Sequence, residues 1–487
     1  MRTQRIVLAI ATLGLVWVLG QHTAPSSTFP EQDYEIVPAE SPAAGMGELS
    51  GPVPREARTN PPLPGFELAA MIVRGDPSGQ IVAQVGERGV TFQPDPESLG
   101  WLKAIGAATE VLDAVRAARV FPDFHFGEAW RRNVCGEAEQ ALRSALKRKA
   151  DSAVLHSMLG SALECQRRGD DAIAEYREAI RLQGNFALAH YSLANALRVR
   201  KDIAGAIPEF RRAAELGNAA AQSDLGWCYY IGLGVPQDAA EAVKWFRKAA
   251  EQGDASAQNR LGVSYDEGKG VRRDQEQAVG WYRMAADRGC VLAQYNLAQK
   301  YNFGAGVPQD YAEAAKWYRK AAEQGYATAQ IDLGVACMKG EGVPQNEEEG
   351  LEWFEEASRQ GDPLGSYFAG LYYWKKGSAS PAVERFELAA RQGSPFGAFT
   401  LAEIYSIGPK SGGEPDNQGA CVWYRIAEQL DKRGGARWWN PADVKKMREE
   451  LPKRIEQLRG RLSPSQFSDC ERQASEWIEE HVKESPQ

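Results

Sequence analysis

The chain has 487 residues, of which 25% are charged, and its formal net charge is −8. This is the composition of an ordinary soluble protein and not of a disordered or membrane-embedded one. The negative charge also disfavours a nucleic-acid partner, because phosphate binding requires clustered Lys and Arg, and no basic stripe with interleaved aromatic residues occurs in the sequence.

The N-terminus predicts a targeting segment. Arg2 and Arg5 precede an apolar run of fifteen residues, Ile6 to Gly20, which ends in small residues suited to cleavage. This arrangement is typical of a secretory signal peptide over residues 1–20. Because the run is short for a membrane span, an uncleaved anchor formed by residues 6–20 is the alternative. We therefore expect a periplasmic or secreted protein, which contacts the inner membrane only if this segment is retained.

Residues 21–65 and 66–120 differ in composition. The first range contains nine prolines among Ser, Gly, Glu and Ala, and it predicts a disordered linker because it cannot bury enough apolar surface to fold. The second range has apolar residues at spacings of three and four, such as Leu99 and Leu102, and it predicts a small helical module. A strand at 90–92 is an alternative within this module.

A pattern with a period of 34 residues follows the module. For example, Tyr176 recurs as Phe210, 34 residues later, within matching sets of small and apolar residues. The pattern resembles the tetratricopeptide repeat, a helix-turn-helix unit. Residues 153–218 hold two such repeats, and residues 121–152 hold a partial one.

A second period, of 36 residues, begins near Asn218 and is marked by tryptophan. The first helix of each copy is expected to end at a Gly-x-Gly loop such as Gly304-Ala-Gly306, because glycine adopts positive φ easily. The second helix is expected to begin at an Asp or Asn cap such as Asp310, with Glu or Gln three residues later, and to end at a glycine such as Gly325. The four tryptophans are Trp245, Trp281, Trp317 and Trp353.

The 36-residue copies resemble the Sel-one-like repeat family, a branch of the tetratricopeptide-type α-solenoids. The resemblance covers residues 218–431, as six repeats of which the last two are degenerate. It implies an all-α fold, an α-solenoid whose helix-turn-helix repeats stack into a right-handed superhelix because no repeat can bury its apolar face alone. Residues 432–487 are expected to form a C-terminal helical cap. Together with the leader, the resemblance suggests an exported bacterial protein.

Seven cysteines in a chain with a predicted signal peptide raise the question of disulfides. A helical hairpin that turns near residue 150 places Cys135 and Cys165 opposite each other, so a bond between them is our first hypothesis. A second, weaker hypothesis joins Cys421 to Cys470 if the last helix packs on the last repeat. Of the other three, Cys228 and Cys337 are expected to be small core residues, and Cys290 is unassigned.

The sequence predicts neither a metal site nor a cofactor site. His156 and His190 stand 34 residues apart at equivalent repeat positions, which indicates packing and not metal ligation. The glycine loops lack the Lys-Ser/Thr of a nucleotide-binding loop, and they follow a helix where such a loop follows a strand.

Two fragments admit an alternative interpretation as an enzyme. Ser144 to Lys147 and Lys410 to Gly412 match two motifs of penicillin-recognising proteins, but the third motif, Ser-x-Asn, is nowhere in the chain. A secreted hydrolase acting on β-lactams or peptidoglycan is therefore the less favoured alternative, and we expect no enzymatic activity.

The favoured function is that of an exported scaffold or adaptor, which binds a peptide segment or a helix of a protein partner on the concave solenoid surface. The first helices of tetratricopeptide repeats line such a surface. Farther along the chain, Trp438 and Trp439 fit a protein-binding hot spot, with closure of the solenoid end as the alternative. The candidate groove residues on the two good repeats are Ser157, Ser161, Glu164, Tyr191, Asn195 and Arg198.

Overall fold

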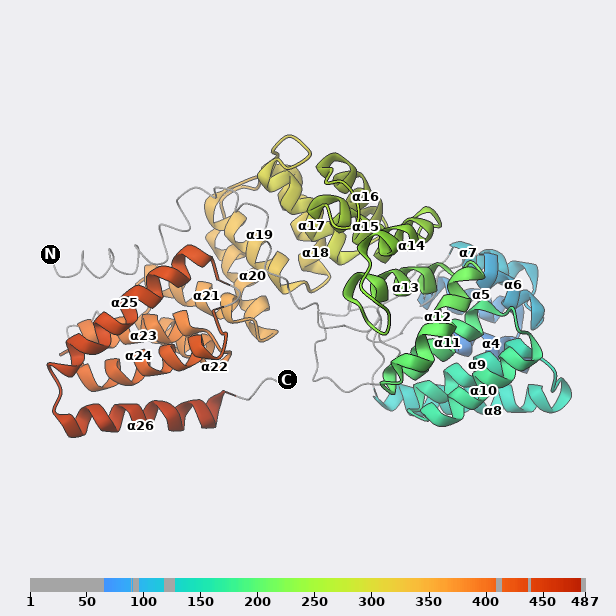
Figure 1. Cartoon of the computed structure of the whole chain (residues 1–487), viewed down its shortest axis with the longest axis horizontal. Helices are drawn as coiled ribbons and strands as arrows, with labels where there is room; N and C mark the ends of the chain where they lie inside the picture. Colours follow the sequence, from blue (N-terminus) through green and yellow to red (C-terminus); the bar gives the residue numbers. More distant parts are fainter. Residues whose placement is uncertain are drawn as a thin grey trace. The chain divides into compact units, whose positions relative to one another are not determined.

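All regular secondary structure in the described part of the chain is helical, as the sequence predicts, and Val90 alone forms an isolated β-bridge (Figure 1). The predicted signal peptide, the linker up to residue 64 and Trp438 lie outside this part. None of the described helices has the length and apolar character that a membrane crossing needs. The computed structural model describes residues 65–88, 90, 96–117, 128–408, 414–436 and 439–482.

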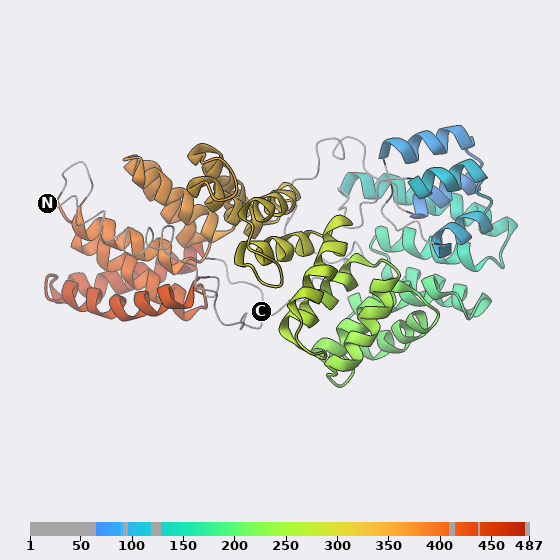
Figure 2. The ribbon, with the colours of Figure 1, turned by 90° about the horizontal axis from the view of Figure 1, so that it is seen from above.

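The chain divides into two compact units within the third 36-residue copy. The N-terminal unit contains residues 65–300 and 305–308, and the C-terminal unit contains residues 301–304 and 309–482. From α8 to α16 in the first unit, and from α18 to α24 in the second, each helix packs on the next one along the chain (Figure 2).

The N-terminal unit starts with four short helices, of which α4 packs against the longer α8 and against α9, while α5 packs on α7. A buried ion pair between Arg88 and Glu67, 2.8 Å apart, joins α5 to α4. The helices are α4 (Gly65–Arg74), α5 (Ser78–Arg88), α6 (Pro96–Ala104), α7 (Thr109–Ala117), α8 (Glu128–Arg148), α9 (Ala153–Cys165), α10 (Gly169–Leu182), α11 (Ala187–Val199), α12 (Ile203–Glu215), α13 (Ala219–Ile231), α14 (Ala239–Glu251), α15 (Ala255–Glu267), α16 (Gln275–Asp287) and α17 (Val291–Phe303).

The C-terminal unit contains the remaining repeats and two further helices, α25 and α26, of which α26 packs closely on α24. Its helices are α18 (Tyr311–Glu323), α19 (Ala327–Lys339), α20 (Glu347–Arg359), α21 (Pro363–Lys375), α22 (Ala379–Arg391), α23 (Pro395–Ile407), α24 (Asn417–Lys432), α25 (Pro441–Arg459) and α26 (Pro464–His481).

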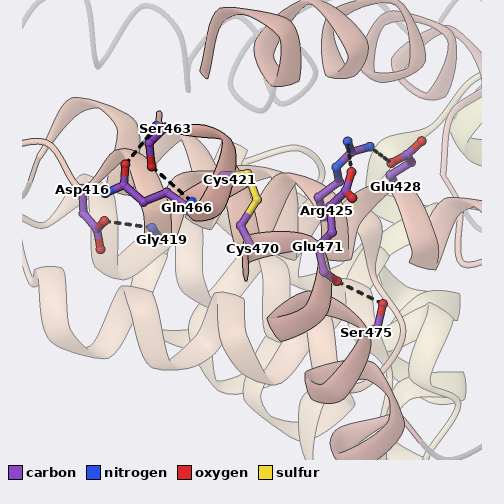
Figure 3. Close-up of a disulfide and its surroundings, with 10 residues drawn as sticks. All are labelled: Asp416, Gly419, Cys421, Arg425, Glu428, Ser463, Gln466, Cys470, Glu471 and Ser475. Carbon is purple, nitrogen blue, oxygen red and sulfur yellow. Dashed lines mark hydrogen bonds and ion pairs between the residues drawn. A yellow bond between two sulfur atoms is a disulfide. The ribbon is translucent and has the colours of Figure 1, made fainter. Parts of the chain in front are cut away.

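The helices begin and end at the residues that the sequence marks. In the four regular 36-residue copies, the first helix ends at a left-handed glycine such as Gly268, with a φ of 72°. The second helix of these copies begins at a capping side chain, as where the Glu241 N–H donates to Asp238 at 2.9 Å. A complete capping box, with both reciprocal hydrogen bonds, forms between Ser463 and Gln466 at the start of α26 (Figure 3). Local hydrogen-bonding chemistry therefore sets the helix boundaries.

In three of the four loops the second glycine lets two backbones meet, whereas Gly234 of the first loop meets the side chains of Ile203 and Ile207. A Cβ atom added at Gly270 would overlap the carbonyl group of Ala239, at the start of the preceding second helix. Gly342 meets the carbonyl group of Tyr311 in the same way. The pattern Gly-x-Gly thus serves two purposes: the first glycine ends a helix, and the second allows neighbouring repeats to touch.

Inside each hairpin, a small residue of the first helix receives an aromatic ring of the second. A Cβ atom at Gly262, for example, would lie 2.7 Å from the ring of Tyr282. The ring belongs to the residue after each periodic tryptophan, and these rings are at most 4% exposed. Trp245, Trp281 and Trp353 themselves are only half-buried. The hairpin core therefore depends on the residue beside the tryptophan that marks the period.

A buried glutamine joins each 36-residue repeat to the one before it. Its side-chain amide donates to the carbonyl of an alanine eight residues earlier, in the last turn of the preceding second helix. Gln252 and Gln360 extend the contact by donating to Gln222 and Gln330, each at 2.8 Å. The four bonds run from Gln222 to Ala214 (3.0 Å), Gln258 to Ala250 (3.0 Å), Gln294 to Ala286 (3.3 Å) and Gln330 to Ala322 (3.1 Å).

Two disulfides connect helices near the ends of the repeats. Cys135 of α8 is bonded to Cys165 of α9, with Cα atoms 6.2 Å apart. Cys421 of α24 is bonded to Cys470 of α26, with Cα atoms 6.0 Å apart (Figure 3). These are the two pairings considered from the sequence. Of the three remaining cysteines, Cys228 and Cys337 are buried and Cys290 is partly exposed.

We predict that Gly342→Ala destabilises the protein more than Gly361→Ala does. Both glycines have positive φ, 74° and 88°, so alanine introduces backbone strain of about 1–2 kcal/mol at either site. Only at Gly342 does the new methyl group also overlap a neighbouring carbonyl. Urea unfolding of the full chain should show a further loss of about 1–3 kcal/mol for Gly342→Ala. Equal losses would contradict the close approach between repeats.

We also predict that Gln222→Met lowers the free energy of unfolding by about 1–2 kcal/mol, because it removes two buried hydrogen bonds at nearly constant side-chain length. The matched control is Gln277→Met, at an exposed position of α16 in the same unit. Thermal and urea denaturation followed by circular dichroism would measure both variants. A control as unstable as Gln222→Met would show that the glutamine contact is not the cause.

Candidate partner-binding surface

The first helices of successive repeats face one another on one side of each unit. α9 contacts α11, and α21 contacts both α19 and α23, whereas successive second helices approach each other less closely. Side chains join these first helices: Arg260 donates to the Ser223 carbonyl at 3.0 Å, and Asn296 to Asn259 at 3.0 Å. A stack that is tighter on one side curves toward that side, so the first helices line the inner face of each unit.

On the first repeat, part of the predicted groove is buried in the structure. Ser157 is 0% exposed, so no partner can reach it, and its prediction as a binding residue is wrong. Ser161 and Glu164 are half-buried, and both contact the hydroxyl of Tyr176, at 3.2 and 2.7 Å. Burial and then the Glu164 carboxylate raise the pKa of Tyr176 well above its usual value. These polar groups therefore complete the hairpin core.

The second repeat exposes more of the predicted surface. Tyr191 is half-buried, and its hydroxyl donates to Asp224 at 3.2 Å. Arg198 is half-buried as well, and it donates to Asn195 at 2.7 Å. Asn195, however, is only 8% exposed and its side-chain oxygen accepts the bond from Arg198, so little of this side chain is open to a partner. Tyr191 and Arg198 are the predicted residues that a partner can reach here.

Three residues of α13 and α15 extend this surface, and the sequence analysis missed them. Arg260 donates to the Ser223 hydroxyl at 2.8 Å, lies 3.6 Å from Asp224, and stacks 5.1 Å from the ring of Trp227. Trp227 is half-buried and occupies the position that Asn195 has in the earlier repeat, one residue after the small helix residue. Carrying the alignment across the change of period would have found Asp224, Trp227 and Arg260.

Trp439 of the predicted hot spot at the C-terminal end is partly covered by other aromatic rings. Trp439 stacks on Phe396, with ring centroids 4.0 Å apart, and meets Tyr367 edge-on at 4.8 Å. It packs against the core of the C-terminal unit and is itself half-buried, so the alternative of solenoid closure accounts for these contacts. Trp438 lies outside the described residues.

The two histidines considered as metal ligands pair with glutamates of the same repeat. Nδ1 of His156 lies 2.6 Å from Glu175, and Nδ1 of His190 lies 2.5 Å from Glu209, so both histidines pair across their own hairpins. The described residues contain no group of three or more side chains suited to a metal. Ser144 is exposed on α8 together with Lys147, and residues 410–412 of the other motif are not described. No observation favours the hydrolase alternative.

Comparison with solved structures finds related repeat proteins. A Sel1 repeat protein from Oxalobacter formigenes is 31% identical, and the match covers 49% of this chain and 96% of that one with a TM-score of 0.44. The protein c5321, a protective antigen of uropathogenic Escherichia coli strains with an SLR fold, is 25% identical over 72% of this chain and 88% of that one, with a TM-score of 0.43. A comparison with curated protein sequences found no match.

The family model of the Sel1 repeat matches five segments of the chain. It leaves out residues 363–394, where α21 and α22 nevertheless form a helix pair. The five segments are residues 219–254, 255–290, 291–326, 327–362 and 395–432. With these repeats, and with 31% identity over nearly the whole of a known member, the chain belongs to the Sel1 repeat family.

Proposed function

We propose that this protein is an exported scaffold that binds a segment of a protein partner on the inner face of its N-terminal unit, from α11 to α17. The observation that carries the proposal is the row of half-buried side chains on consecutive first helices. Tyr191, Trp227, Val263 and Tyr295 stand on α11, α13, α15 and α17 in turn. Aromatic residues of this kind are the usual anchors of protein interfaces.

The charges of this face suggest what kind of segment it receives. Arg260 pairs with Asp224, and Lys300 pairs with Asp266, so the charged side chains of neighbouring repeats neutralise one another. A partner therefore gains little from net charge, and the apolar and aromatic side chains remain as the main source of affinity. We expect a peptide segment or helix with apolar anchors, bound with weak dependence on salt.

The disulfides support export. Disulfides persist in oxidising compartments and are rare in the reducing cytosol. The bonds Cys135–Cys165 and Cys421–Cys470 therefore agree with the signal peptide expected at residues 1–20. Peptide mapping without reduction, applied to cell fractions, should recover both bonds from the periplasmic or secreted material. Finding all four thiols reduced in an interior fraction would contradict export.

Site-specific photo-crosslinking in cells tests the binding surface. A photoreactive residue placed at Val263 on the inner face should give protein adducts, and adding Trp227→Ala should reduce them at least several-fold, because the anchor is lost. The matched control carries the photoreactive residue at Lys244, which is 67% exposed on the second helix α14. Identical adducts from both positions would contradict an inner-face site.

A further inference from the structure

The inner face of the last two repeats is covered by the chain's own C-terminal extension. Tyr367 precedes the small helix residue Gly370 by three positions, as Tyr191 precedes Ala194, so the two tyrosines are equivalent. By the same alignment, Glu403 is equivalent to Asn195, and Phe396 to Leu188. Whereas Tyr191 and Leu188 are half-buried, Tyr367, Phe396 and Glu403 are each 3% exposed.

Two contacts from the extension cover these positions. Trp439 lies against Phe396 and Tyr367, at centroid distances of 4.0 and 4.8 Å. Fifteen residues later, Nε of Arg454 lies 3.2 Å from the carboxylate of Glu403. An aromatic ring and a cation of the extension thus contact the positions equivalent to Tyr191, Leu188 and Asn195, of which Tyr191 and Leu188 are half-buried in the N-terminal unit and Asn195 is buried.

Helix α25, which follows Trp439 and contains Arg454, has the pattern of a groove-binding helix. Its apolar residues recur at spacings of three and four, and they join the core that contains Phe396. Its opposite face is charged. Amphipathic helices that lie in grooves use this arrangement of anchors. The apolar stripe consists of Val444, Met447, Leu451, Ile455 and Leu458.

The fit of this segment is incomplete. Among the described residues, the indole N–H of Trp439 has no hydrogen-bond acceptor, although it is buried. A solvent-open hollow of about 410 Å³ lies between parts of α24 and α25, lined mostly by charged residues and also by Leu451, Ile455 and Phe467. Solvent therefore reaches the edge of the contact between α24 and α25 from this side.

We propose that Trp439 and α25 occupy, in cis, a helix-binding site of the C-terminal unit, and that an amphipathic helix of a partner with the same aromatic anchor and basic residue displaces them. The proposal rests on the proposed function only in treating inner faces as binding surfaces. The disulfide between Cys421 and Cys470 encloses α25 in a covalent loop, so the displaced segment stays close and competes at high effective concentration.

A synthetic, fluorescently labelled peptide spanning Trp439 to Gly460 tests this site, with full-length oxidised protein and fluorescence anisotropy as the readout. The wild type should bind the peptide weakly because its own segment competes. Trp439→Ala/Arg454→Ala should bind it at least tenfold more tightly. Trp477→Ala, which alters α26 and leaves the cis contacts intact, is the matched control and should bind like the wild type.

A second variant distinguishes release of the cis segment from misfolding of the unit. Arg454→Glu places a carboxylate opposite Glu403 without altering the apolar stripe, and Arg454 is 36% exposed. It should also bind the peptide several-fold more tightly than the wild type. A peptide whose first residue is Ala in place of Trp should bind every variant at least tenfold more weakly.

Two outcomes would overturn the proposal: no gain in affinity in either variant, or equal binding of the two peptides. Crosslinking from Val263 reports only on the N-terminal unit. It therefore separates failure of this inference from failure of the proposed function.

Discussion

The buried glutamine contact between repeats is the interaction on which the stack depends. A carbonyl in the last turn of a helix lacks the partner that the helix interior would supply, and burying it without a donor is costly. In this chain the donor comes from the following repeat, as Gln258 does for Ala250. The contact fixes both the distance and the register between neighbouring hairpins. The close approach at Gly270 and Gly342 is possible only in that register.

The junction between α20 and α21 shows that the constraint holds even where the period changes. Serine replaces the glutamine at position 366, and its hydroxyl lies 2.6 Å from that of Ser358. Gln392, from the end of the next second helix, donates to the Ser358 carbonyl at 3.0 Å. A different side chain therefore donates to the carbonyl at the equivalent position of this repeat. The family model does not match this copy, but its helix pair retains the packing of its neighbours.

Much of the fold could be predicted from the sequence because the repeats are built from local signals. Caps such as Asp238 and terminal glycines such as Gly268 act within a few residues. Accessibility depends instead on contacts between distant segments. Nothing near Ser157 shows that it is buried, and nothing near Trp439 shows that Phe396 and Tyr367 receive it. Asp224, Trp227 and Arg260 were missed for a different reason, since the alignment of first helices stopped where the period changed.

The glutamine contact also has a consequence for how such proteins change length. Each repeat supplies a donor to the one before it and receives a donor from the one after it. Deleting residues 255–290 as a block would bring Gln294 to the place of Gln258, and Ala250 would still be satisfied. A duplication of 36 residues would equally leave every pair matched. The array can therefore lengthen or shorten by whole repeats during evolution or engineering, whereas a partial insertion would leave one carbonyl without its donor.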